Sequence, residues 1–171
     1  MKYAGVALMI ALAACGDRTT APAVMPDDTA ATLALGRAAL HGQPRDIPRA
    51  RAYFARAAQD GSGAAAYYLG VLAERDPAER IHWLTIAAGR GEPHAMFLLG
   101  NAYRSGVGVP RDDARALAYY SQAAEAELPA ALQTLAMAYR VGELGLTPDE
   151  DEARRYEMEA GHALDHPPAE P

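Results

Sequence analysis

The residue types that usually carry out chemistry are sparse in this sequence and seldom stand at a productive spacing. His162 and His166 are four residues apart, so they could share one helix face and hold a metal ion there. No H-E-x-x-H pattern surrounds them, and the two prolines that follow His166 should end a helix at that point. The sequence therefore predicts neither a metal site nor a cofactor.

Candidate nucleophiles and phosphate-binding loops are equally weak. None of the serines stands in a G-x-S-x-G pattern, which would place a nucleophile on a sharp turn between a strand and a helix. The segment Gly106-Val107-Gly108 lacks the preceding strand and the later glycine of a dinucleotide site, and no lysine follows it as in a phosphate-binding loop. We predict that the chain is not an enzyme.

The only cysteine, Cys15, follows a segment with the features of an export signal. Residues 1–14 contain a positive charge at Lys2, a short apolar run and two small residues directly before the cysteine. The apolar run is shorter than the roughly 20 residues that span a bilayer. We expect residues 1–14 to be a cleaved signal peptide.

The four residues Leu12-Ala13-Ala14-Cys15 resemble the lipobox of bacterial lipoproteins. That resemblance implies cleavage before Cys15 and acylation of that residue, palmitate included, which would anchor the protein to a membrane. It also implies a periplasm-facing protein of the cell envelope, in the outer membrane because Gly16 rather than an aspartate follows. The alternative is an ordinary cleaved signal beside an incidental cysteine.

Composition narrows the class of protein further. Half of the residues are hydrophobic, alanine is the commonest and strand formers are few, which favours closely packed helices. The formal net charge is −6 and Lys2 is the only lysine, which argues against a nucleic-acid-binding protein. A single cysteine excludes an internal disulfide framework.

Periodicity divides the rest of the chain into three parts. Residues 15–28 lack periodicity and contain prolines and polar residues, which predicts a flexible, lipid-attached tether. Residues 29–165 carry helical periodicity and should form the folded domain, with Asp28 or Thr29 as the cap of its first helix. We predict that residues 166–171 are a disordered tail.

Four units recur within residues 29–165, at steps of roughly 30 to 36 residues that are typical of helical solenoids. Each first helix contains a Leu-Gly pair, or Leu-Ala in the last unit, and an alanine four residues before the leucine. Each second helix contains a bulky pair, namely Tyr53-Phe54, Trp83-Leu84, Tyr119-Tyr120 and, as we align the last unit, Arg155-Tyr156. Glycine should let a neighbouring helix approach closely, and the aromatic residues should fill the space between hairpins.

The unit from Ala95 to Ala124 follows the pattern A-x-x-x-L-G-x-x-Y-x-x-G-x-G-V…D-x-x-x-A-x-x-Y-Y-x-x-A-A. This pattern resembles the Sel1-like repeat, a relative of the tetratricopeptide repeat. The resemblance implies an all-α, right-handed α-solenoid of about four helix–turn–helix units. Each hairpin of such an array buries one face against the previous hairpin and another against the next.

Two units depart from the pattern. The second unit lacks the Gly-x-Gly-Val loop and should have a tight turn, with a capping box formed by Asp76, Pro77 and Glu79. In the fourth unit we expect the second helix to begin with Thr147 as its cap and Pro148 as its first residue. The acidic residues that follow suit a solvated helix N-terminus.

The first helices of a helical solenoid line its concave face, which is the usual partner surface. The positions two before the leucine, one after the glycine and four after the glycine should point into that groove. The predicted partner-binding residues are Tyr67, Val71, Glu74, Phe97, Asn101, Arg104, Gln133, Met137 and Arg140, with Leu33, Arg37 and Leu40 in the first unit. Arg104 and Arg140 stand at equivalent places and could together clamp a carboxylate or phosphate. The alternative is that the rings pack between helices and the arginines pair with nearby carboxylates.

These observations predict an envelope lipoprotein that binds a protein or peptide in its groove as a non-catalytic scaffold. Resemblance to some lipoproteins with such repeats suggests a narrower hypothesis, a periplasmic immunity protein that inhibits a toxic secreted effector. Resemblance to larger helical-repeat lipoproteins suggests a structural part in an exopolysaccharide or division complex. A hydrolase acting on the cell wall or on β-lactams is less favoured, because the paired cysteines of the secreted relatives are absent.

Overall fold

The computed structural model describes residues 28–165, and all regular structure in that range is helical. The helices are α1 (Thr29–His41), α2 (Ile47–Gln59), α3 (Gly63–Leu72), α4 (Pro77–Gly89), α5 (Pro93–Ser105), α6 (Asp113–Glu125), α7 (Pro129–Val141) and α8 (Glu150–Asp165). The predicted signal peptide, Cys15, most of the predicted tether and the predicted tail lie outside the described residues.

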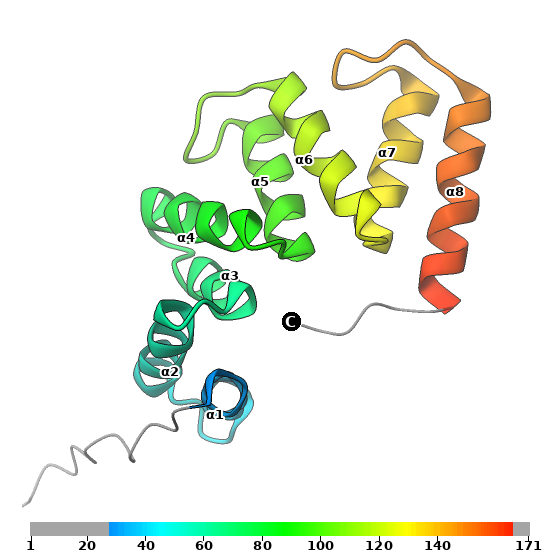
Figure 1. Ribbon diagram of the computed structural model, residues 1–171. Helices are drawn as coiled ribbons and strands as arrows, with labels where there is room; N and C mark the ends of the chain where they lie inside the picture. Colours follow the sequence, from blue (N-terminus) through cyan, green and yellow to red (C-terminus); the bar gives the residue numbers. More distant parts are fainter. Residues whose placement is uncertain (1–27, 166–171) are drawn as a thin grey trace, which may run out of the picture.

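Successive helices pair into four hairpins, and each hairpin packs mainly against the next one along the chain. The hairpins follow an arc, with α1 and α3 on its inner side relative to α2 and α4 (Figure 1). The predicted all-α solenoid of four helix–turn–helix units is therefore confirmed. Within residues 28–165, none of the helices combines the length and apolar character that crossing a bilayer requires.

An aspartate caps the start of the second helix in every hairpin. The caps are Asp46, Asp76, Asp112 and Asp149, whose carboxylates accept hydrogen bonds from main-chain N–H groups in the following turn. These bonds satisfy donors that a helix start leaves unpaired. The caps also give the second helices a common register, so residues at the same distance from the cap are equivalent. Asp28 caps α1 in the same way, so of the two predicted caps Asp28 is correct and Thr29 is the first helical residue.

The predicted start of the last helix is wrong by two residues. Helix α8 begins at Glu150, because Asp149, and not Thr147, accepts the capping hydrogen bonds. The main-chain N–H of Asp149 also donates to the carbonyl oxygen of Tyr139 at 2.8 Å, which ties the cap to α7. The register of α8 therefore shifts by one from our alignment, and Tyr156 rather than Arg155 corresponds to Tyr53, Trp83 and Tyr119.

The tight turn of the second hairpin is confirmed, and it has Asp76 as the cap and Pro77 as the first helical residue. The expected capping box is not closed, because the carboxylate of Glu79 faces elsewhere. Its Oε1 accepts a hydrogen bond from Nη2 of Arg51 at 2.6 Å and another from Nε1 of Trp83 at 3.3 Å. Glu79 therefore links the second hairpin to the first.

In the first three hairpins, the glycine of the Leu-Gly pair lies beneath a large side chain eight residues after the cap. The pairs are Gly36 with Phe54, Gly70 with Leu84, and Gly100 with Tyr120. A Cβ atom added to Gly100 would lie 2.6 Å from Cε1 of Tyr120, which is far inside van der Waals contact. The predicted close approach of helices at these glycines is confirmed.

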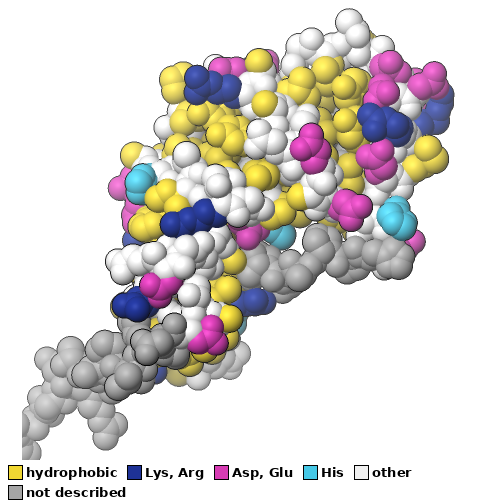
Figure 2. Space-filling view, in the orientation of Figure 1, with side chains coloured by type: hydrophobic (Ala, Val, Ile, Leu, Met, Phe, Trp, Pro, Cys, Tyr) yellow, Lys and Arg dark blue, Asp and Glu magenta, His cyan; other side chains and the backbone are white. Residues whose placement is uncertain are grey.

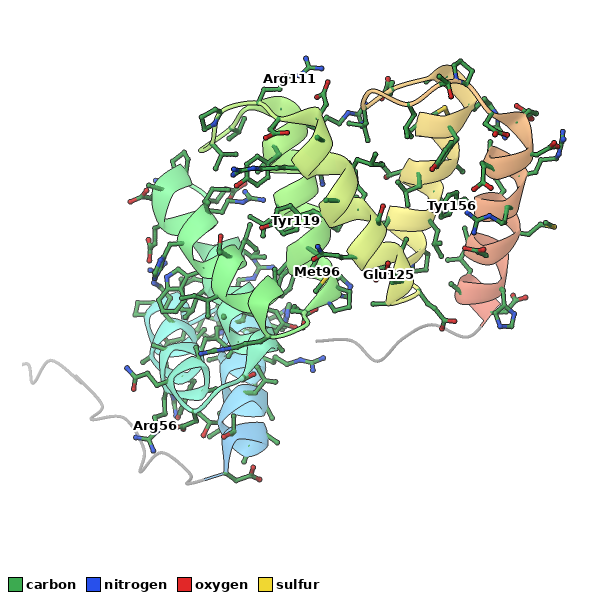
Figure 3. The ribbon with its side chains drawn as sticks, turned by 45° about the horizontal axis from the view of Figure 1, so that its top comes forward. Arg56, Met96, Arg111, Tyr119, Glu125 and Tyr156 are labelled. Atoms are coloured by element: carbon green, nitrogen blue, oxygen red, sulfur yellow. The ribbon has the colours of Figure 1, made fainter. Side chains whose placement is uncertain are left out.

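The fourth hairpin replaces both members of this pair. Ala136 stands at the glycine position and Glu157 at the position of the large side chain. Glu157 is exposed and forms an ion pair with Arg140, 2.6 Å from Oε1 to Nη2. Charged side chains gather over α8 (Figure 2), whereas Tyr156 lies between α7 and α8 and stacks on Tyr139 (Figure 3).

The first hairpin differs at its leucine. Leu35 is 37% exposed, whereas the equivalent Leu69, Leu99 and Leu135 are at most 2% exposed. Those three leucines lie on helices that pack against a preceding hairpin, and no hairpin precedes α1 within residues 28–165.

Candidate functional site

The predicted groove residues lie on α1, α3, α5 and α7 and on the turn after α3, and their exposure differs widely. Met137 is 51% exposed and Val71 is 37% exposed, and both are large apolar side chains. Gln133 and Glu74 are also exposed. These four side chains are open to solvent and so are available to a ligand.

The two aromatic groove residues are partly taken up by packing. Tyr67 is half-buried, with its ring edge-on to Tyr68 at 5.4 Å and tilted against His94 at 5.6 Å. Burial raises the pKa of Tyr67 above its usual value. Phe97 is half-buried against the ring of Tyr120 at 5.7 Å. The alternative of rings packed between helices therefore describes part of each side chain.

Asn101 also has a structural contact. Its Oδ1 accepts a hydrogen bond from the hydroxyl of Tyr120 at 2.8 Å. Tyr120 is fully buried, and burial raises the pKa of its hydroxyl, an effect that Arg104 partly opposes. The Asn101 side chain thus satisfies the polar end of a buried ring, which would be costly to leave unpaired.

The predicted clamp of Arg104 and Arg140 is not formed as two free guanidinium groups. Arg104 pairs with Glu143, 2.8 Å from Nη2 to Oε2, and Arg140 pairs with Glu157. A second carboxylate, that of Glu150, lies 3.6 Å from Nε of Arg140. The alternative of pairing with nearby carboxylates is correct for both arginines.

Two cavities are lined by the groove residue Glu74. One, of about 220 Å³, lies between the turn that joins α3 to α4 and the second half of α5, and both Glu74 and Asn101 line it. The other, of about 710 Å³, lies between the first two hairpins and is lined by Leu40, Val71 and Glu74 among others. The smaller cavity also contains Arg80, which the sequence reasoning missed. Aligning the second helices on their aspartate caps would have revealed it, because the other three hairpins have alanine at that position.

No cluster that could hold a metal ion occurs in the part of the chain that the structure describes. His162 lies near the end of α8 and interacts within the chain, and His166 falls beyond the described residues. The pair of histidines considered above is therefore not placed by the structure.

Four stacked helical hairpins with polar and apolar side chains on their first helices define a repeat protein of the solenoid class. The Sel1 repeat model matches residues 29–62, 63–92, 93–128 and 129–156, and the chain belongs to the Sel1 repeat family. Proteins of this family generally serve as non-catalytic scaffolds for protein interactions. No curated protein is similar enough to the chain to count as a match.

Solved structures show the same fold. A Sel1 repeat protein from Oxalobacter formigenes has a TM-score of 0.72 and 22% identity, over 78% of this chain and 56% of that one. The protein c5321, a protective antigen present in uropathogenic Escherichia coli strains and displaying an SLR fold, has a TM-score of 0.72 and 32% identity. That match covers 79% of this chain and 30% of the other. The chain thus spans only part of the length of both proteins.

Proposed function

We propose that this protein is an envelope lipoprotein whose groove binds an extended segment of a partner protein, without catalysis. The observation that carries the proposal is the exposure of Val71 and Met137 at equivalent positions of two hairpins. Each directly follows the glycine or alanine of the Leu-Gly pattern. Exposed apolar side chains that repeat at one register are typical of a surface that contacts a partner.

The groove offers both apolar and polar contacts to such a segment. Val71 and Met137 supply apolar contacts, the half-buried Tyr67 supplies a ring with a hydroxyl, and Gln133 supplies an amide. Tyrosine is one of the side chains that dominate the energy of protein interfaces, and an amide can fix the direction of a bound main chain. The same contacts would form with a free peptide and with an extended segment of a folded partner protein.

Site-specific photo-crosslinking tests the groove. A benzoylphenylalanine placed at position 71 or at position 137 should crosslink one partner protein in native cells, and mass spectrometry should map both crosslinks to one segment of it. The same group at Gln122, an exposed residue on the second helix α6, is the matched control and should give no such product. Equal crosslinking from Gln122 would show that the groove is not the binding surface.

The anchor rests on Cys15 and on the signal-like residues before it. Two or more acyl chains on one residue hold a protein to a membrane far more firmly than a single myristoyl chain does. Cys15→Ala should abolish labelling by a palmitate analogue and release the protein from the membrane fraction. Undiminished labelling and membrane retention in this variant would refute the lipoprotein proposal and leave the groove proposal untouched.

A further inference from the structure

One position in the second helices breaks the pattern of the repeats. Four residues after the aspartate cap, three hairpins have an alanine that is fully buried, namely Ala50, Ala116 and Ala153. The second hairpin has Arg80 at this position, with its main-chain N–H donating to the cap residue as in the other hairpins. A core position of the repeat therefore carries a cationic side chain in one hairpin alone.

Arg80 is half-buried, and its side chain makes no ion pair or hydrogen bond with any residue between 28 and 165. By contrast, Arg51 pairs with Glu79 and Arg140 pairs with Glu157. Glu74 lines the same cavity without pairing with Arg80. Charged side chains that leave solvent are normally paired, so a guanidinium in this position is suited to an anionic ligand.

The cavity beside Arg80 has walls that fit a short segment of peptide. Ile81, Leu98 and Val107 provide apolar surface, and Val107 is 58% exposed at the entrance. The loop after α5 folds over the start of α4, since a Cβ atom added to Gly108 would lie 2.9 Å from Ile81. The cavity is therefore bounded by the second hairpin, by α5 and by the loop that joins α5 to α6.

Polar groups beside Arg80 can complete the recognition of an anion. Asn101 lines the cavity and uses its Oδ1 for Tyr120, which leaves its amide N–H groups as donors. The charge of Arg80 also reaches the groove residue Tyr67, whose pKa it lowers against the larger opposing effect of burial. Because Arg80 lines the same cavity as the groove residues Glu74 and Asn101, a ligand in the groove would meet it there.

We propose that the Arg80 cavity binds a carboxylate of the partner, from an acidic side chain or from a chain end, while the rest of the segment lies along the groove. A guanidinium matches the two oxygens of a carboxylate with two parallel N–H donors, which favours this group over a single-atom acceptor. This inference rests on the proposed peptide-binding function and names the chemistry that the partner must carry.

Selection from two phage libraries of random short peptides tests the inference with the full chain as bait. In one library the peptide ends in a free carboxylate, and in the other it is followed by the coat protein, so only side chains can supply the anion. We expect selected peptides to carry Asp, Glu or a free chain end. Synthetic copies should bind the Arg80→Ala variant about ten- to a hundredfold more weakly than the original protein.

Matched variants separate a binding role from a structural one. Arg80→Ala installs the residue that three other hairpins carry, so thermal unfolding should show no loss of stability. Arg56→Ala removes an exposed arginine of α2 that lines neither of the two cavities beside the groove, and this variant should bind the same peptides as the original protein does. Arg80→Gln gives the same comparison should the alanine variant fail to fold.

The outcomes distinguish the two proposals. Peptides that bind Arg80→Ala as tightly as the original protein would overturn the carboxylate site and leave groove binding in place. Replacing the carboxylate of the peptide by an amide should weaken binding to the original protein and not to Arg80→Ala, and equal weakening would also overturn the site. Libraries that yield no binder would overturn the proposed peptide-binding function, and this inference with it.

Discussion

The third and fourth hairpins differ in the side chain that stands eight residues after the aspartate cap and in the residue of the first helix that pairs with it. In the third hairpin, Tyr120 lies over Gly100 and belongs to the same buried cluster as Leu132 of the next hairpin. In the fourth hairpin, Ala136 stands at the glycine position, and the position of the large side chain is occupied by Glu157, which is exposed and ion-paired. A large side chain at this position needs a glycine beneath it and a further hairpin beside it, and where no further hairpin is described a carboxylate replaces it.

The comparison predicts its largest effect at the glycine of the third hairpin. Gly100→Ala should destabilise the protein by about 1–3 kcal/mol, because the new Cβ atom meets the buried ring of Tyr120. This is the net effect, because the steric cost of the new Cβ atom should exceed the gain of about 1 kcal/mol in helix propensity. Thermal unfolding measures it, at about 2–4 °C per kcal/mol for a domain of this size.

The reverse substitution in the fourth hairpin is the matched control. Ala136→Gly should also destabilise, by about 1–2 kcal/mol, since no ring there requires a glycine and the substitution loses both the helix propensity of alanine and its buried methyl group. If Gly100→Ala raised the melting temperature, the glycine would not be a packing requirement and the contrast between the two hairpins would fail.

A smaller effect is expected from the hydroxyl of Tyr120. Tyr120→Phe should lower the free energy of unfolding by about 1 kcal/mol, because Oδ1 of Asn101 loses its donor at 2.8 Å. Chemical denaturation at neutral pH measures this change. An unchanged stability would mean that water replaces the hydroxyl without cost.

The same residue predicts a response to alkaline pH. Burial raises the pKa of Tyr120, so the folded protein retains this proton at a pH where the unfolded chain has lost it. The contribution of this proton to the free energy of unfolding is therefore fully present below the ordinary tyrosine pKa of about 10. It is lost as the pH rises through the pKa that Tyr120 has in the folded protein. The free energy of unfolding, measured by chemical denaturation at a series of pH values across this range, should fall less steeply with pH for Tyr120→Phe than for the original protein. Identical slopes would contradict this assignment.

The smallest effect is expected at the fourth hairpin. Glu157→Gln breaks the pair with Arg140, whose two side chains are 47% and 35% exposed, so it should cost about 0.2–1 kcal/mol and less in high salt. Glu143→Gln, which breaks the similarly exposed pair with Arg104, should behave alike. A cost above that of Gly100→Ala would mean that the ion pair, and not the absence of a packed ring, defines the last hairpin.

Much of the fold could be predicted because the close packing of the hairpins requires small and large residues at fixed positions of each repeat. Leu99 and Gly100 stand at helical spacing beside an aromatic pair, and the same arrangement recurs in neighbouring units. The start of α8 could not be predicted, because Thr147-Pro148 is as good a local start as Asp149. The hydrogen bond from the main-chain N–H of Asp149 to the carbonyl oxygen of Tyr139 favours Asp149 as the cap, and this bond exists only in the folded chain.

The candidate site was less predictable for the same reason. A pattern can place Arg104 and Arg140 on equivalent turns, but their carboxylates come from Glu143 and Glu157, which are distant in sequence or on another helix. Arg80 was within reach of the sequence, since it replaces a recurring alanine. It was missed because the units were aligned on their first helices instead of on the caps of the second.

The exposure of Leu35 gives the array a direction. A hairpin added ahead of α1 would find a leucine that is already 37% exposed and would bury it as the equivalent leucines are buried elsewhere. A hairpin added after α8 would instead have to cover Glu157 and Arg154, and so would require charges to lose water. Lengthening by duplication of a unit would therefore bury a leucine on the α1 side, whereas on the α8 side it would have to remove water from these charges in order to cover Met158, which is 71% exposed.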